Sequence, residues 1–244
     1  MANHFTNGKI GYTLRNADEN AMRIISEKNL NKLFILVCVG LLLAGCGMPT
    51  KHPNLFGDLV CEPPCWEYIV PGATTKEDAL VALSGVDAVD QPISDLENTA
   101  RGFDSELRFS LYGQDNLSGS IFITDGRVSL IEFGTELDIS LEEAIELFGA
   151  PQSILAFHSN LYWVTLVNPQ TGIAFGYSSV GHPNWVYSEI RPEVGINVVM
   201  FFDPKQYEQI LDSGFLSYYL LSSEETKSKL RPWNGYGDLS QYEE

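Results

Sequence analysis

Two closely spaced cysteines carry the most specific side-chain chemistry in the sequence. Cys61 and Cys65 are separated by Glu-Pro-Pro. In an oxidising compartment such a pair can join, and we predict a Cys61–Cys65 disulfide that closes a small proline-rich loop. Three alternatives stay open. The first is a redox-active pair, although the C-x₃-C spacing differs from the C-x-x-C of such pairs. The second is a metal site, for which the chain offers only four histidines as further ligands. The third is that both thiols remain free.

Catalytic groups are sparse. His158 and His182 are the histidines of the expected folded part, and each lies in a segment that we interpret as a loop. The chain contains no G-x-S-x-G, H-E-x-x-H or glycine-rich phosphate motif. Carboxylates are plentiful, but none follows the calcium-loop pattern. We therefore predict no catalytic residue, no metal site and no cofactor.

The charge balance argues against one class of partner. The chain has 244 residues, with 15 Lys+Arg against 32 Asp+Glu and a formal net charge of −17. Nucleic-acid binding needs clustered basic side chains, so we expect no nucleic-acid partner. With 44% hydrophobic residues the chain can build a core.

An apolar segment near the N-terminus predicts a location. Leu33 to Gly45 are all apolar or glycine, and Arg23, Lys28 and Lys32 precede them. The run is shorter than the roughly 20 residues that span a membrane, and it is typical of a signal peptide. We predict a leader over residues 1–45. Residues 1–21 are interpreted either as an overcalled start, because a normal signal could begin at Met22, or as an unusually long n-region.

The end of that segment is more specific. Leu43-Ala44-Gly45-Cys46 resembles the lipobox of bacterial lipoproteins. The resemblance implies cleavage before Cys46, a diacylglyceryl group on its thiol and acylation of the new amino terminus. Two or three acyl chains hold a domain firmly on a membrane. The alternatives are an ordinary secretory signal with a chance cysteine and an uncleaved anchor helix.

Cleavage at this point would leave an acidic extracytoplasmic chain. It would remove five basic and three acidic residues, so the net charge becomes −19. Anionic lipid repels such a domain. We therefore expect residues 46–60 to form a tether that holds the domain away from the membrane surface. Gly47, rather than a retention Asp, follows Cys46 and implies the outer membrane where the host has one.

Hydrophobic periodicity predicts helices and antiparallel strands in the remainder. One helix is expected to begin after Thr74 or Thr75, either of which can be its N-cap, and to stop near Gly85. A second is expected within 139–151, where Ser140 and Glu143 form a capping box and Gly149 and Pro151 end the helix. Asp125-Gly126 is typical of a tight hairpin turn. We interpret 86–102 as a loop with a short helix over 93–100. Strands are expected over 107–112, 119–124, 127–133, 161–167, 172–178 and 196–202. Two further helices are expected over 204–211 and 215–225.

The pattern repeats along the chain. Thr75-Lys76-Glu77-Asp78-Ala79 aligns with Ser140-Leu141-Glu142-Glu143-Ala144 at an offset of 65 residues. We predict an α+β fold of two tandem helix-on-antiparallel-sheet units, over 61–136 and 137–244. The second unit carries a C-terminal strand and helices.

The repeated motif also carries a resemblance. Pro71–Leu80, and the second copy ending Leu147-Phe148-Gly149-Ala150-Pro151, resemble the helix motif of BamE/SmpA-type envelope lipoproteins. That similarity implies small α/β units whose tandem copies resemble the β-lactamase-inhibitor-protein fold. The first copy lacks a proline after Gly85. Pro63-Pro64-Cys65-Trp66, with the Pro232-Trp233 tail, resembles uncharacterised lipoproteins of Chloroflexi-like bacteria, a family that implies no function.

These observations favour a non-enzymatic binding or envelope-assembly lipoprotein, with the membrane and an envelope protein as partners. One alternative is an inhibitor or small-ligand module, which needs exposed aromatic side chains. Another is a wall or glycan hydrolase with two facing carboxylates. The aromatic candidates for a ligand surface are Tyr112, Tyr162, Trp163, Tyr177 and Trp185.

Overall fold

The structure is a computed structural model. It describes residues 55–56, 60–97, 99, 102–111, 117–134, 137, 139–159, 161–178 and 189–242. The predicted leader and Cys46 lie outside this part of the chain, as do Tyr112, His182 and Trp185.

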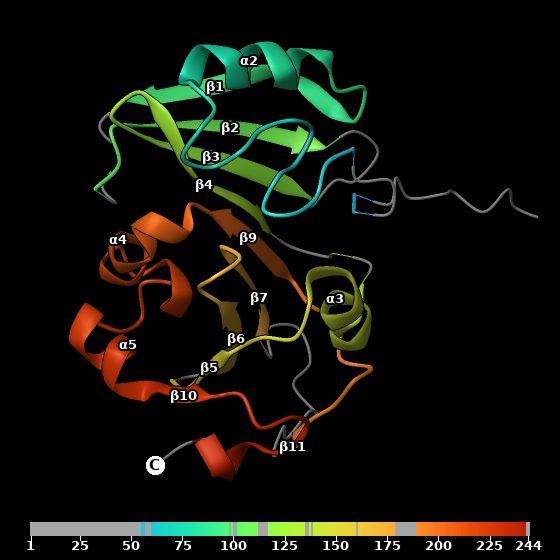
Figure 1. The fold of residues 1–244 in the computed structure, drawn as a ribbon, viewed down its shortest axis with the longest axis vertical. Coiled ribbons are helices and arrows are strands. Elements are labelled where there is room, and N and C mark those ends of the chain that lie inside the picture. The colour runs from blue at the N-terminus through green and yellow to red at the C-terminus, as the bar shows by residue number, and fades with distance from the viewer. Residues whose placement is uncertain are drawn as a thin grey trace, which may run out of the picture. The chain divides into compact units, whose positions relative to one another are not determined.

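One nine-stranded antiparallel sheet dominates the described residues, so the α+β prediction is confirmed (Figure 1). Its order is β1-β2-β3-β4-β9-β7-β6-β5-β10, and a small second sheet pairs β11 with β8. The strands are β1 (Val89–Glu97), β2 (Ser105–Leu111), β3 (Ser118–Thr124), β4 (Arg127–Gly134), β5 (Ser153–His158), β6 (Tyr162–Asn168), β7 (Ile173–Ser178), β8 (Glu189–Ile190), β9 (Val198–Phe202), β10 (Leu230–Pro232) and β11 (Gly237–Asp238).

Helices lie on both faces of the large sheet. The described α-helices are α2 (Lys76–Gly85), α3 (Leu141–Phe148), α4 (Tyr207–Asp212) and α5 (Ser223–Lys229), with 3₁₀ turns η1 (Pro204–Gln206), η2 (Phe215–Ser217) and η3 (Leu239–Tyr242). The buried side chains of α2 and α3 join one core cluster, and those of α4 and η2 join the other. In Figure 1, α3 and the α4–α5 pair accordingly lie on opposite sides of β9, β7 and β6.

Alternation along the strands explains the two cores. In β4, Ile131 and Phe133 belong to the cluster under α2 and α3, whereas Leu130 belongs to the cluster under α4 and η2. Successive side chains of a strand point to opposite faces, so a central strand that is covered on both sides reads as a continuous apolar run. All five residues of β9 are buried for this reason.

Helices α2 and α3 begin in the same way. Thr75 caps α2 and bridges to Arg127, while Ser140 caps α3 and bridges to Gly195. Equivalent backbone hydrogen bonds follow at offsets of 65 residues on the helix side and 68 on the strand side. The bond from Lys76 N to Gly126 O (3.0 Å) at α2 corresponds to that from Leu141 N to Val194 O (2.7 Å) at α3. The bond from Val128 N to Thr74 O (2.9 Å) likewise corresponds to that from Ile196 N to Ile139 O (3.0 Å).

A glycine makes room for the aromatic core under α2. Gly119 pairs with Phe109 across β2 and β3, and the Phe109 ring occupies the space that a Cβ at Gly119 would fill. Trp66 stacks on the Phe109 ring, with 5.7 Å between the ring centroids. The close approach explains why a glycine is accommodated within a strand.

Several local predictions are confirmed. Ser140 and Glu143 form the capping box, Thr75 rather than Thr74 caps α2, and Asp125-Gly126 is the turn between β3 and β4. Both turn residues adopt positive φ, 51° and 71°, as a hairpin turn of two residues requires.

Three local predictions are wrong. Residues 89–97 form edge strand β1 rather than a loop and helix, because pairing along β2 outweighs their weak strand propensity and Pro92 is tolerated at an edge. The single helix expected over 215–225 is interrupted, since Tyr218 and Tyr219 adopt left-handed backbone angles. Strand β5 was not expected, because its apolar run has no alternation to reveal it.

Candidate functional site

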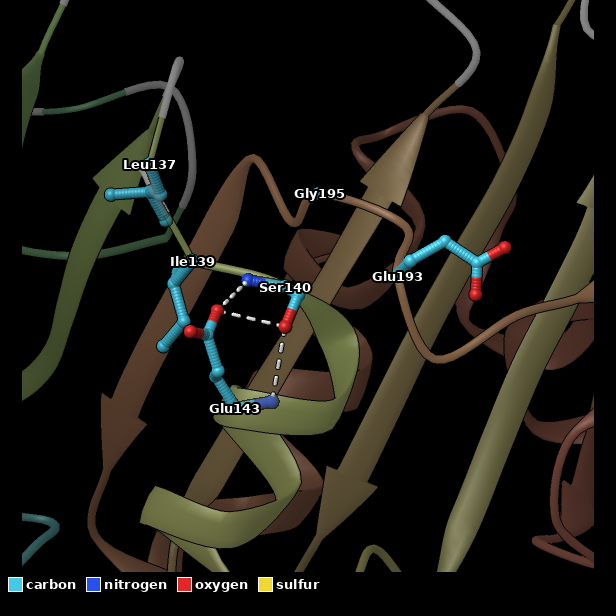
Figure 2. A pocket seen from close by; sticks show the side chains of 6 residues that line it. All are labelled: Leu137, Ile139, Ser140, Glu143, Glu193 and Gly195. Carbon is cyan, nitrogen blue, oxygen red and sulfur yellow. Dashed lines mark hydrogen bonds between the residues drawn. The ribbon is translucent and has the colours of Figure 1, made fainter.

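A shallow cavity of about 380 Å³ opens at the start of α3. Its lining comes from the segment before α3, the first turn of α3 and the segment before β9 (Figure 2). The lining residues are Leu137, Ile139, Ser140, Glu143, Glu193 and Gly195.

The Glu143 carboxylate lines the cavity and belongs to the helix cap. Its Oε2 accepts hydrogen bonds from the Ser140 backbone N–H and from the Ser140 hydroxyl, both at 2.8 Å. These bonds, the backbone one first, hold the pKa of Glu143 below its ordinary value. The carboxylate is therefore ionised at neutral pH and is unsuited to donate a proton.

The second carboxylate does not complete a catalytic pair. Glu193 is exposed, and in Figure 2 its side chain points away from Ser140 and Glu143. Glycoside hydrolysis needs two carboxyl groups that face one scissile bond. The two glutamates of this cavity are not arranged in that way.

A polar face lies on the opposite side of the sheet, on β2 and β3. We call Arg108, Ser110, Ser118 and Ser120 the polar face. Glu106 underlies it, with its side chain only 5% exposed, and its Oε1 accepts hydrogen bonds from Arg108 Nε (3.1 Å), Arg108 Nη2 (2.9 Å) and Ser120 Oγ (2.8 Å). The Arg108 side chain is 53% exposed, so the guanidinium is both oriented and accessible.

An aromatic loop lies on the same side of the sheet as the polar face. Tyr218 and Tyr219 follow η2 with φ of 52° and 61°, and the Tyr218 ring contacts Trp163 at 4.3 Å between centroids. Among the described residues, the buried Tyr218 hydroxyl has no hydrogen-bond partner. Burial raises the pKa of Tyr218 well above its usual range, and the charge of Glu132 adds to this. Tyr218 therefore stays neutral.

The sequence-predicted residues fall into three groups. Cys61 and Cys65 form a disulfide in the structure. Of the candidate ligand aromatics, Tyr177 is buried and Tyr162 and Trp163 are half-buried, which weakens the idea of an aromatic ligand surface. His158 is exposed at the end of β5 and packs on Tyr162 at 4.5 Å.

Sequence reasoning missed the polar face. Its signal was present in the alternation of β2, where Glu106, Arg108 and Ser110 occupy every second position. Alternation identifies one polar side of a strand but does not say whether another element covers it. The helices that could have covered it are distant in sequence.

No described helix is long and apolar enough to cross a membrane. No group of three or more His, Cys, Asp or Glu among the described residues could hold a metal ion.

The comparisons with known proteins do not assign the chain to a family. No protein-family model, no curated protein and no solved structure matches it. The two family resemblances of the sequence stay predictions.

Proposed function

We propose that this chain is a lipid-anchored, non-enzymatic binding module that contacts a basic envelope protein through the polar face. The carrying observation is the unequal covering of the sheet. The C-terminal elements α4 and η2 cover β9, β7 and β6, whereas Arg108, Ser110 and Ser118 on β2 and β3 are exposed on that side of the sheet.

The polar face has the properties of a preorganised contact surface. It lies on paired strands rather than on a loop, so its side chains hold their relative positions. Glu106 fixes the guanidinium of Arg108 through two hydrogen bonds. Arginine is enriched among the residues that dominate binding energies, and an oriented arginine loses less conformational freedom on contact.

The charge of the chain supports a basic partner. The full chain carries −17, and the chain from Cys46 onward would carry −19. Such a field accelerates encounter with a positively charged protein, and salt weakens the effect. Arg108 would then serve for hydrogen bonding within the contact rather than for steering.

The internal repeat supports the architecture of two tandem units. The matched caps and hydrogen bonds of α2 and α3, and the antiparallel pairing of β4 with β9 at the centre of the sheet, favour a duplicated unit. On this proposal, β1–β4 belong to the first copy, and β5–β7 with β9 to the second. The C-terminal elements are an addition that covers the second copy and reaches Leu130 of β4 and Phe122 of β3 in the first, but leaves Arg108, Ser110 and Ser118 exposed.

The alternatives have less support. The cavity at α3 contains Glu143 as a helix cap and Glu193 pointing elsewhere, which disfavours a carboxylate hydrolase. The burial of Tyr177 disfavours an aromatic ligand surface.

The anchor is tested by intact mass. Protein purified from its native membrane should begin at Cys46 and carry acyl mass, and a Cys46→Ala variant should leave the membrane fraction. A chain that keeps residues 1–45, or is cleaved without lipid, would overturn the anchor.

The polar face is tested by site-specific cross-linking. A photo-reactive amino acid at Ser118 should capture a basic envelope protein in native membranes, and capture should fall at least fivefold in 0.5 M salt. The same group at Val81, which is 74% exposed on α2, is the matched control. A Ser118→Trp variant should abolish association by bulk alone. Equal capture at both positions, or capture that salt does not alter, would contradict the proposal.

A further inference from the structure

Phe56 lies in the predicted tether, yet it is buried in the core. The side chain is 3% exposed and belongs to the cluster under α2 and α3. Leu55 is half-buried and packs against the same cluster. The tether expected over residues 46–60 therefore contains a core contact.

The three rings around Phe56 come from both halves of the sheet. Phe56 contacts Phe148 at 5.4 Å, Phe133 at 5.7 Å and Phe201 at 6.2 Å between centroids, each edge-on. Phe133 lies on β4, Phe201 on β9, and Phe148 ends α3. Because β4 and β9 pair directly, Phe56 packs over the seam between the two halves.

A second attachment follows a few residues later. Trp66 is 1% exposed, stacks on Phe109 and also contacts the Phe133 ring at 4.8 Å. The Cys61–Cys65 disulfide closes the short loop that directly precedes Trp66. The chain thus meets the core at Phe56 and again at Cys65 and Trp66.

We propose that Phe56 docks the membrane tether onto the seam and thereby limits how far the domain can stand from the membrane. This inference rests on the proposed lipid at Cys46. Ten chain steps separate Cys46 from Phe56, and they extend to at most roughly 34 Å. Without docking, fifteen steps to Cys61 would extend to roughly 51 Å.

Loss of the Phe56 contact would change the reach of the tether. Undocking Phe56 would lengthen the tether by about 17 Å at full extension, while the disulfide and Trp66 would keep the rest of the domain closed.

Docking is tested by limited proteolysis, which needs no lipid. Chymotrypsin should cleave after Leu55 and Leu59 at least tenfold faster in Phe56→Asp than in the unaltered chain. Phe56→Leu, which keeps an apolar side chain, should cleave nearly as slowly as the unaltered chain. Phe56→Ala serves if Phe56→Asp does not fold. Equal cleavage in all folded variants would overturn docking.

Reach is tested by energy transfer on liposomes. A donor dye at exposed position 81 and acceptor lipids in the bilayer report the height of the domain. Phe56→Asp should lower the transfer, as should a six-residue Gly/Ser insertion after Lys51, whereas Phe56→Leu should not. If the insertion lowers the transfer and Phe56→Asp does not, the proposal fails. A chain that lacks lipid fails to bind liposomes at all, so loss of the proposed anchor is distinguished from loss of docking.

Discussion

Arg108 donates two hydrogen bonds, from Nε and Nη2, to a single carboxylate oxygen of Glu106. The two residues lie two positions apart on β2 and therefore share one face of the sheet. Because Glu106 is 5% exposed and Arg108 is 53% exposed, the pair connects the interior to the surface. A buried carboxylate thus orients an accessible guanidinium.

Removing Arg108 should destabilise the fold. Arg108→Ala removes two hydrogen bonds from the buried Glu106 carboxylate and leaves the one that Ser120 Oγ donates. An under-satisfied buried group costs about 1–3 kcal/mol, so the urea midpoint should fall without a change in slope. Adding Glu106→Gln should recover part of the loss. Ser110→Ala, on the same strand and exposed, should stay within about 0.5 kcal/mol. An unchanged midpoint in Arg108→Ala would show that the pair does not support the fold.

The disulfide should contribute moderately to stability. Cys61 and Cys65 close a five-residue loop, for which the chain-entropy relation gives about 2 kcal/mol. For a domain of this size, Cys61→Ser/Cys65→Ser should lower Tm by roughly 4–8 °C. Dithiothreitol should lower the Tm of the unaltered chain by the same amount and leave the double variant unaffected. If reductant lowers both equally, the effect is unrelated to this bond.

Gly119 should not accept a side chain. A Cβ there would overlap the Phe109 ring, and Phe109 is itself confined by Trp66. Overpacking of this kind costs about 1–3 kcal/mol, so Gly119→Ala should lower the free energy of unfolding by that amount. Phe109→Leu should relieve part of the cost in the double variant. Gly85→Ala, where nothing lies within 4 Å, is the matched control. A Gly119→Ala chain as stable as Gly85→Ala would contradict the packing.

The α3 cap should give a pH-dependent stability. The Ser140 hydrogen bonds lower the pKa of Glu143 from 4.5 in the folded chain. A lowered pKa stabilises the fold above the unfolded value and is lost as the pH falls through the folded value. Glu143→Gln should therefore be less stable than the unaltered chain at pH 7, and the gap should shrink below about pH 4.5.

A neighbouring glutamate provides the control for the cap. Glu142 lies in the same first turn, is exposed and shares the proximity to the helix N-terminus. Glu142→Gln should show a smaller gap at pH 7, measured by urea unfolding across the pH range. A gap for Glu143→Gln that stays constant down to pH 3 would exclude the carboxylate as its source.

Local sequence patterns determined the parts of this protein that depend on neighbours along the chain. The caps at Thr75 and Ser140, the Asp125-Gly126 turn and the alternating strands β2–β4 follow from backbone hydrogen bonding and side-chain period within a few residues. The α+β class follows from their sum. The predicted lipid at Cys46 likewise rests on four adjacent residues, and it lies outside the described part of the chain.

Tertiary structure decided what depends on burial by distant segments. Nothing local in residues 89–97 predicts a strand, which forms because β2 offers an edge. The insertion of β9 between β4 and β7, the packing of α4 and η2 against the sheet, and the burial of Phe56 over the seam each join residues far apart in sequence. Hydrophobic burial has no direction along the chain, so the sequence supplied the amphipathic surfaces and the fold selected which of them stayed exposed.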